Sequence, residues 1–202
     1  MKKFLTAAAF AAASVSPALA QDTVNFNGPW LGATVGYDKV TLEVAGDSGS
    51  EDGVLYGVSA GYDINTGSVV FGVEAELTDS TTKETASDIF IAGDSAKLSA
   101  GRDIYAGVRF GVPVSPEFLV YAKGGYTNAR AKLTYDDGVD VFSESDNLEG
   151  YRIGGGIEWQ SSNTFARIEY RYSDYGEYEY QGVATGIEAS RHQVAVTGGF
   201  RF

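Results

Sequence analysis

The most constraining feature of this chain is a two-residue alternation of apolar with polar or small residues, which recurs along most of its length. In residues 103–111, for example, every even position is apolar, while the odd positions are mostly charged residues or glycine. A period of two places successive side chains on opposite faces of a strand, whereas a helix repeats every 3.6 residues. The pattern therefore predicts an all-β chain whose strands have two different surroundings.

Eight segments carry this alternation, and each is long enough for the roughly 9 to 11 residues of a tilted membrane-crossing strand. The composition agrees, because 26 glycines and 13 tyrosines stand against only 4 prolines. An even number of strands lets both chain ends lie at one end of a barrel. The eight segments lie near residues 29–37, 53–63, 69–77, 103–111, 118–129, 151–160, 164–172 and 193–202.

The connections between these segments alternate between short and long. Residues 63–67, 112–116 and 161–163 are short and rich in turn-forming residues. The four remaining links are long and hold 19 of the 27 acidic residues. This rhythm predicts an eight-stranded antiparallel up-and-down transmembrane β-barrel, with short periplasmic turns and long extracellular loops. The expected long loops are residues 38–52, 78–97, 133–149 and 173–190.

Alternation alone does not say which face points outward, because a soluble β-sandwich also alternates. The polar face is unusually rich in glycine, which weakens an exposed strand but makes room inside a narrow barrel. The acidic and basic residues of this face are also nearly equal in number. Charges confined in a lumen need partners, because burying an unpaired ion costs several kcal/mol of free energy. We therefore expect an ion network in the lumen, formed by Glu74, Glu76, Asp103, Arg109, Lys123, Arg152, Glu158, Arg167, Glu169, Arg171 and Arg201.

The apolar face is then expected to contact lipid. Large aromatic residues near the strand ends are typical of the girdles that barrels place at the two membrane interfaces. The candidates are Tyr37, Tyr62, Tyr126, Trp159, Tyr170 and Tyr172.

Both ends of the chain carry targeting patterns. Lys2 and Lys3 precede an apolar stretch, and Ala18 and Ala20 supply the small residues of a cleavage site before Gln21. We therefore expect residues 1–20 to be a signal peptide and residues 21–202 to be one barrel domain.

The last strand ends in Phe200 and Phe202, separated by one residue. A terminal phenylalanine on an alternating strand resembles the signal read by the machinery that assembles outer-membrane barrels. The same pattern also fits a plain C-terminal strand.

Composition narrows the function. The net charge of −12 argues against a nucleic-acid binder, which needs basic residues to neutralise phosphates. The chain has no cysteine, which excludes disulfides and thiolate metal sites. His192 is the only histidine, so a histidine metal centre or a conventional catalytic triad is not expected. We expect no cofactor and no catalytic residue.

Several segments carry a family resemblance: residues 28–32, 71–76, 121–126, 154–158 and the final Phe202. In order and spacing they resemble the small outer-membrane β-barrel family typical of alphaproteobacteria, often described as porin-family or outer-membrane protein A-like barrels. The resemblance covers the expected mature chain. It implies an integral protein of the bacterial outer membrane that meets lipids, lipopolysaccharide and the assembly machinery, as a monomer. It implies a location and a fold, but no reaction.

Two functions follow most directly from such a barrel. Eight strands enclose a lumen just wide enough for side chains, which favours a structural envelope protein with a filled, salt-bridged interior. The alternative is a small porin-like channel, in which glycine-rich walls leave a thin file of water and the ion pairs exchange partners.

Two further functions are less favoured. A lipid-modifying barrel enzyme would need a general base, and alternation places Ser190 on the same face as His192, near the junction of the last strand with its loop. A rim position is the simpler interpretation of this histidine. A divalent cation could bind an acidic loop, although the spacing matches no EF-hand and acidic runs are usually solvated. Its candidate ligands are Asp136, Asp137, Asp140, Glu144 and Asp146.

Overall fold

The computed structural model describes residues 26–44, 47–87, 95–136, 141–180 and 183–202. The expected signal peptide, with Ala18, Ala20 and Gln21, lies outside these residues. Among the described residues, no helix is long and apolar enough to cross a bilayer. The strands are β1 (Gly28–Val44), β2 (Asp47–Asn65), β3 (Val70–Ser80), β4 (Lys83–Ser87), β5 (Ser95–Pro113), β6 (Phe118–Asp136), β7 (Val141–Ser161), β8 (Thr164–Tyr180) and β9 (Val183–Arg201).

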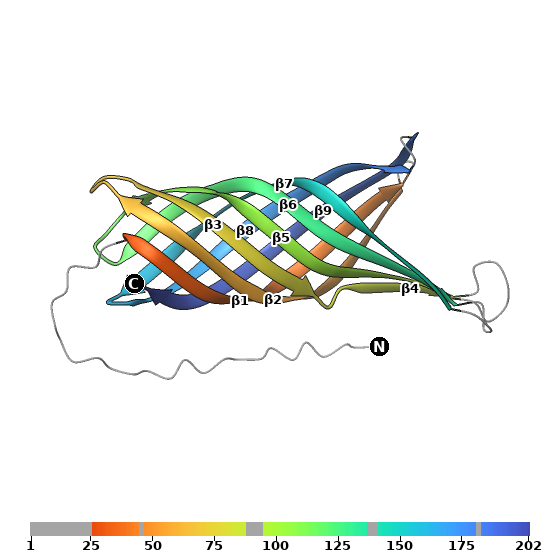
Figure 1. Ribbon diagram of the computed structural model, residues 1–202, viewed down its shortest axis with the longest axis horizontal. Helices are drawn as coiled ribbons and strands as arrows, with labels where there is room; N and C mark the ends of the chain where they lie inside the picture. Colours follow the sequence, from red (N-terminus) through yellow and green to blue (C-terminus); the bar gives the residue numbers. More distant parts are fainter. Residues whose placement is uncertain (1–25, 45–46, 88–94, 137–140, 181–182) are drawn as a thin grey trace.

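All strand pairs are antiparallel, and together they close a barrel (Figure 1). Sequential neighbours pair along the sheet except β3 and β4, which both pair with β5, and β9 pairs with β1. Because β3 and β4 pair with successive parts of β5, they form one interrupted strand, and the barrel wall has eight strands. The predicted eight-stranded antiparallel barrel is confirmed.

The connections at the two ends of the barrel differ from the sequence prediction in one respect. Residues 66–69, 114–117 and 162–163 form the expected short turns, at the end where β1 begins and β9 stops. We call this the turn end and the opposite one the flared end. The long loops predicted at the flared end are wrong, because most of their residues continue the strands. The hairpin of β1 and β2, for example, is paired up to Val44 and Asp47.

The reason for this error is physical. Where a strand leaves the apolar layer, both of its faces meet water, so its sequence loses the apolar half of the alternation while its backbone stays paired. In the hairpin of β6 and β7, pairing continues to Asp136 and Val141 through residues with no regular apolar face.

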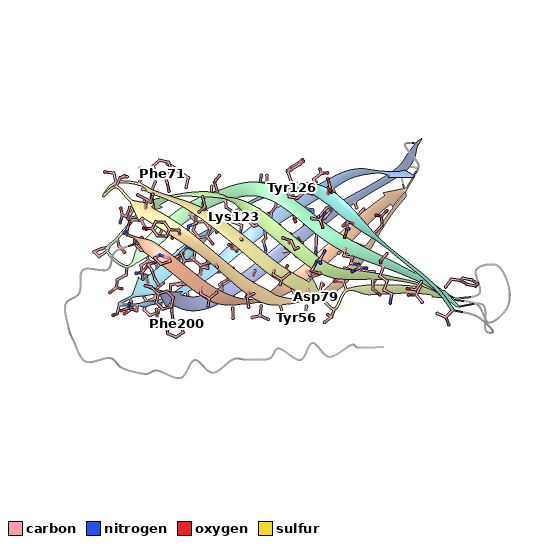
Figure 2. All side chains as sticks on the ribbon, viewed as in Figure 1. Tyr56, Phe71, Asp79, Lys123, Tyr126 and Phe200 are labelled. Carbon is pink, nitrogen blue, oxygen red and sulfur yellow. The ribbon has the colours of Figure 1, made fainter. Side chains whose placement is uncertain are left out.

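The outer face of the barrel is apolar, and the inner face is polar. On β3, Val73 and Leu77 are about half exposed on the outer face, whereas Glu74 and Glu76 between them are buried. Figure 2 shows Phe71 and Phe200 projecting outward from the wall near the turn end. The aliphatic side chains therefore surround the barrel, and the ionic ones fill it.

Apolar side chains are buried inside the barrel at the turn end. Phe26, which precedes β1, packs with Val70 and Leu119 in a cluster that is at most 2% exposed. Beside it, the rings of Trp30 and Phe165 meet edge to face, with centroids 5.7 Å apart. We call these five residues the apolar seal.

Candidate functional site

The charged lumen is the candidate site. Fourteen charged residues of the described chain are buried inside the barrel, and seven acids face seven bases, so their formal charges cancel. Every one of them forms at least one ion pair. The acids are Asp38, Asp63, Glu74, Glu76, Asp103, Glu158 and Glu169, and the bases are Arg109, Lys123, Arg152, Arg167, Arg171, Arg191 and Arg201.

Four of these residues form a closed ring just inside the apolar seal. Arg109 contacts Asp63 at 3.2 Å and Glu158 at 2.9 Å. Arg201 contacts the other oxygens of the same two carboxylates, at 2.7 Å each. The four side chains come from β5, β2, β7 and β9, which are alternate strands around the wall. We call this arrangement the charge ring, and it reaches across the lumen.

Lys123 is the centre of the next layer. Its Nζ lies 2.8 Å from Glu74, 2.6 Å from Glu76 and 3.2 Å from Glu169. Tyr121 donates a 2.7 Å hydrogen bond from its hydroxyl to Glu169. One ammonium group is thus shared by three carboxylates, and their excess charge is balanced by arginines above and below.

Arginines dominate the layer toward the flared end. Arg171 binds Glu76, and Arg152 donates to Asp103. Arg191 binds Asp38 through two nitrogens at 2.6 Å each and also contacts Asp103 at 3.0 Å. The pairs are linked through shared partners, so a single network connects Lys123 to the flared end.

Asp38 receives neutral hydrogen bonds in addition to its arginine. Ser80 and Thr82 donate to one of its oxygens, and Gln193 donates to the other at 3.0 Å. A buried carboxylate is stable only when its lone pairs are satisfied in this way. These residues come from β1, β3, β9 and the short break after β3. The hydrogen bonds of Asp38 therefore link the strands on both sides of the interruption in the wall.

Arg167 is held differently from the other bases. Its guanidinium lies 4.0 Å from the ring centroid of Trp30 and 5.0 Å from that of Phe165. Its distance to Glu74 is 3.7 Å, and its three nitrogens have no hydrogen-bond partner among the described residues. Stacking on aromatic faces stabilises this cation in place of close hydrogen bonds.

Glycines give the long side chains their space. Gly107 and Gly125 are direct partners on β5 and β6, next to the layer of Lys123. A Cβ on Gly125 would lie 2.2 Å from the carbonyl oxygen of Ala106 and 2.4 Å from the Cα of Gly107. Neighbouring backbones occupy that space, so only glycine fits there.

The structure places all eleven residues of the predicted ion network in the lumen, each with an ion-pair partner. The predicted ion network omits Asp38, Asp63 and Arg191, which lie at or just beyond the ends of the expected strands. Each of them continues the inward-facing register by two residues beyond an inward glycine or glutamine. That continued register was the signal that could have identified them.

The predicted girdle residues lie on the outer face. Tyr37, Tyr62, Tyr126, Trp159 and Tyr170 are each 40% to 51% exposed. The sixth predicted girdle residue, Tyr172, is only partly exposed. Other exposed aromatic residues of the described chain are Tyr56, Phe71, Phe110, Phe118, Phe142, Tyr151, Phe200 and Phe202.

The position predicted for His192 is wrong, because it lies inside β9 and is not at a strand–loop junction. The expected loop is a continuation of the strand, as at the other hairpins. Its Nδ1 is 2.6 Å from the hydroxyl of Tyr170, and its ring centroid is 4.9 Å from that of Tyr172. The histidine therefore belongs to an outward aromatic cluster.

The candidate cation ligands remain a prediction. Asp137 and Asp140 lie outside the described residues, and Asp136, Glu144 and Asp146 belong to β6 and β7, not to a loop. Within the described ranges, no group of three or more acidic or histidine side chains could hold a metal ion.

Residues 5–202 match the family model described as an outer membrane protein beta-barrel domain. The chain belongs to this family. A relative is the 22 kDa outer membrane protein of Rhizobium leguminosarum bv. viciae, 33% identical over 140 residues, which are 67% of this chain and 60% of that protein. Another is the 25 kDa outer-membrane immunogenic protein of Brucella abortus biovar 1, 26% identical over 88% of this chain and 78% of that protein.

Two solved structures of outer-membrane barrels illustrate the shared fold. Neisserial surface protein A has a TM-score of 0.51 and 16% identity, over 85% of this chain and 97% of that one. Ail of Yersinia pestis has a TM-score of 0.50 and 13% identity, over 87% of this chain and 99% of that one. Family and fold place this protein in the bacterial outer membrane.

Proposed function

We propose that this protein is a structural component of the outer-membrane envelope whose lumen is closed to solutes. The charge ring is the observation that carries the proposal, because its four side chains span the lumen and are only 0% to 3% exposed. The apolar seal lies between the ring and the turn end and adds a second barrier. An eight-stranded barrel leaves no room for a solute beside such a filling.

Conductance across a planar lipid bilayer tests this proposal. We expect the purified mature protein to insert without steady current steps. As a positive control, the double variant Arg109→Ala and Arg201→Ala removes both cations of the ring and should leak if it folds. Reproducible steps from the unaltered protein, absent in mock preparations, would contradict a closed lumen.

A small channel is the second candidate, and Arg167 is the observation that favours it. Three buried nitrogens without hydrogen-bond partners among the described residues are groups that water satisfies in proteins. A file of water beside Arg167 would still have to pass the charge ring and the apolar seal. In the bilayer experiment, the channel function predicts current from the unaltered protein.

The barrel's partners are part of the same proposal. A continuous apolar outer face with aromatic residues near both ends supports direct contact with outer-membrane lipids and lipopolysaccharide, as a monomer. Phe200 and Phe202 are proposed to be the signal that the barrel assembly machinery binds.

A lipid-modifying activity is less favoured, because His192 is engaged with Tyr170 and Tyr172. An altered lipid A acylation pattern in a His192→Ala strain would overturn that ranking.

A further inference from the structure

Three basic residues lie close together on the outer face of the wall at the flared end. They are Arg102 on β5 and Arg130 and Lys132 on β6, and all three are exposed. Ile104 and Tyr126, which are 41% and 50% exposed on the outer face, lie on the same strands nearer the turn end. Alternation along each strand therefore places the three basic side chains on this outer face. We call them the basic patch.

A β-bulge brings Arg102 beside Arg130. The register of β5 and β6 shifts between Ala100 and Asp103, which leaves two residues of β5 opposite one residue of β6. The two are Gly101 and Arg102, and the one is Arg130. A Cβ on Gly101 would lie 3.1 Å from the carbonyl oxygen of Arg130, so the two backbones are close at this point. Bulges redirect side chains, and this one places two guanidinium groups on the same stretch of the outer wall.

Ser145 on β7 joins the other two members of the patch. Arg130 donates a 2.7 Å hydrogen bond from its Nη2 to the hydroxyl of Ser145. Ser145 is also the direct cross-strand partner of Lys132, and such partners have Cβ atoms about 4.5 to 5.5 Å apart. The serine hydroxyl accepts the bond from Arg130, so its own hydrogen is still a donor. A guanidinium, an ammonium and a hydroxyl group therefore converge, and these are the donors that bind phosphate oxygens.

Acidic residues flank the basic patch but do not neutralise it. On the same outer face, Glu149 of β7 is the partner of Asn128, and Asp79 of β3 accepts a backbone hydrogen bond. Asp146 is the partner of Ala131 and lies on the opposite face of the wall. None of the three basic residues forms an ion pair within the described part of the chain. Among the side chains described on this stretch of the outer face, three cations therefore stand against two acids, although the whole chain has a net charge of −12.

Other outer positions at this level carry no such excess of positive charge. On β1 and β2, Lys39 lies directly opposite Asp52. On β7 and β8, Tyr151 and Tyr172 donate hydrogen bonds to Asp174, at 3.1 Å and 3.2 Å. Like charges on neighbouring strands destabilise a sheet, and a bound anion relieves their repulsion. The basic patch is thus the described part of the outer face that best fits an anionic ligand.

The depth of the basic patch identifies the source of the anion. Arg102 is the next outward residue beyond Ile104 toward the flared end. A strand that rises about 3.4 Å per residue and tilts by about 40° gains roughly 5 Å along the membrane normal between successive outward residues. The headgroup layer is roughly 5 to 8 Å thick on each side of the hydrocarbon core. The patch therefore begins at the depth of lipid headgroups.

From these observations we infer that the basic patch, with the hydroxyl of Ser145, binds a phosphate group of lipopolysaccharide. Lys132 lies one outward position further from the apolar band than Arg130, so the patch extends beyond the phosphate layer of a phospholipid. The sugar headgroup of lipopolysaccharide, which carries phosphates, reaches that far. This inference rests on the proposed contact with lipopolysaccharide and assigns that contact to one place on the wall. It is independent of whether the lumen is closed or conducts.

The probe is lipid A, the phosphorylated lipid part of lipopolysaccharide, mixed with the mature barrel in a neutral detergent. Native mass spectrometry measures how much lipid stays bound to each barrel. We expect saturable binding of lipid A, and the same lipid without its phosphates should bind at least about tenfold more weakly, because each basic residue near a charged headgroup adds severalfold affinity. Neither inorganic phosphate nor phosphatidylglycerol, at the concentration of the lipid A, should displace it. Displacement by either would show a site for any phosphate and would overturn the proposal.

Matched variants locate the site on the barrel. Arg130→Gln should weaken binding of lipid A roughly fivefold, and adding Arg102→Gln and Lys132→Gln should weaken it further. Lys39→Gln is the control, because it removes an equal charge that lies opposite Asp52 on another part of the wall, and it should bind lipid A like the unaltered protein. Each variant is first checked for folding by its gel mobility with and without boiling.

Two negative results would have different meanings. If the triple variant binds lipid A as tightly as the Lys39→Gln control, the site is not the basic patch, although the contact with lipid still holds. If the unaltered barrel binds lipid A neither with nor without its phosphates, the proposed contact with lipopolysaccharide is itself contradicted.

Discussion

Asp63 and Glu158, which face each other from β2 and β7 across the barrel, are bound by the same two arginines, Arg109 and Arg201. Each arginine bridges both carboxylates, so the four groups form a cycle in which every charge has two opposite neighbours. Alternate strands supply them, as expected where inward-facing side chains of a narrow barrel stack in layers. The remaining ten buried charges form a second set of five acids and five bases.

Breaking the charge ring should destabilise the barrel strongly. Glu158→Gln keeps the side-chain shape but leaves two arginines sharing Asp63, and removal of one partner from a buried pair costs about 3 to 5 kcal/mol. The measurement is the free energy of unfolding in urea, in lipid vesicles. Glu117→Gln in the exposed turn is the control and should stay within about 0.5 kcal/mol. Equal effects of the two changes would mean that the ring does not stabilise the fold.

The layer around Lys123 should show strong coupling between residues. Lys123→Met strands three carboxylates, and Glu169→Gln removes one of them. The double variant should therefore lose less stability than the sum of the single losses, by about 0.5 to 3 kcal/mol. A double-mutant cycle built from four unfolding curves measures this difference. Simple additivity would indicate that Lys123 and Glu169 do not interact in the folded barrel.

The requirement for glycine should depend on the face of the wall. Gly125→Ala places a Cβ against the backbone of β5 and should cost about 1 to 3 kcal/mol through overpacking. Gly198→Ala is the matched change, because a Cβ there meets nothing within 4 Å. It should be neutral or stabilise by up to about 1 kcal/mol. Thermal gel-shift midpoints compare the two, and a tolerated alanine at position 125 would refute the tight packing of β5 against β6.

The sequence predicts the barrel well because its wall has two chemically opposite faces. Neighbouring residues such as Val73 and Glu74 have opposite surroundings, one on the outer face and one in the lumen. This alternation repeats along each strand, so the number of strands, their antiparallel order and the inward-facing charges can be predicted from the sequence. The alternation of apolar and polar residues ends where both faces of a strand become polar. That loss explains why the extensions of β6 and β7 were interpreted as loops, and why Asp38 and Arg191 were not included in the ion network.

The partners within the lumen could not be predicted. Glu76 contacts Lys123, Arg152 and Arg171, which come from β6, β7 and β8, and only the closed barrel brings these side chains together. Pairing in the lumen depends on side-chain length and on strand stagger, neither of which leaves a local pattern. The apolar seal was also missed, because Phe26 precedes the first alternating segment.

The central claim is that the apolar outer face contacts lipid, and a pair of lysine substitutions tests it most directly. Val108 on β5 and Val141 at the flared end of β7 are 62% and 65% exposed, but only Val108 lies within the apolar band. In lipid vesicles, Val108→Lys should cost about 2 to 4 kcal/mol of unfolding free energy, since a lysine at mid-membrane loses its hydration. Val141→Lys should change it by less than about 0.5 kcal/mol. A lysine tolerated equally at both positions would contradict the account.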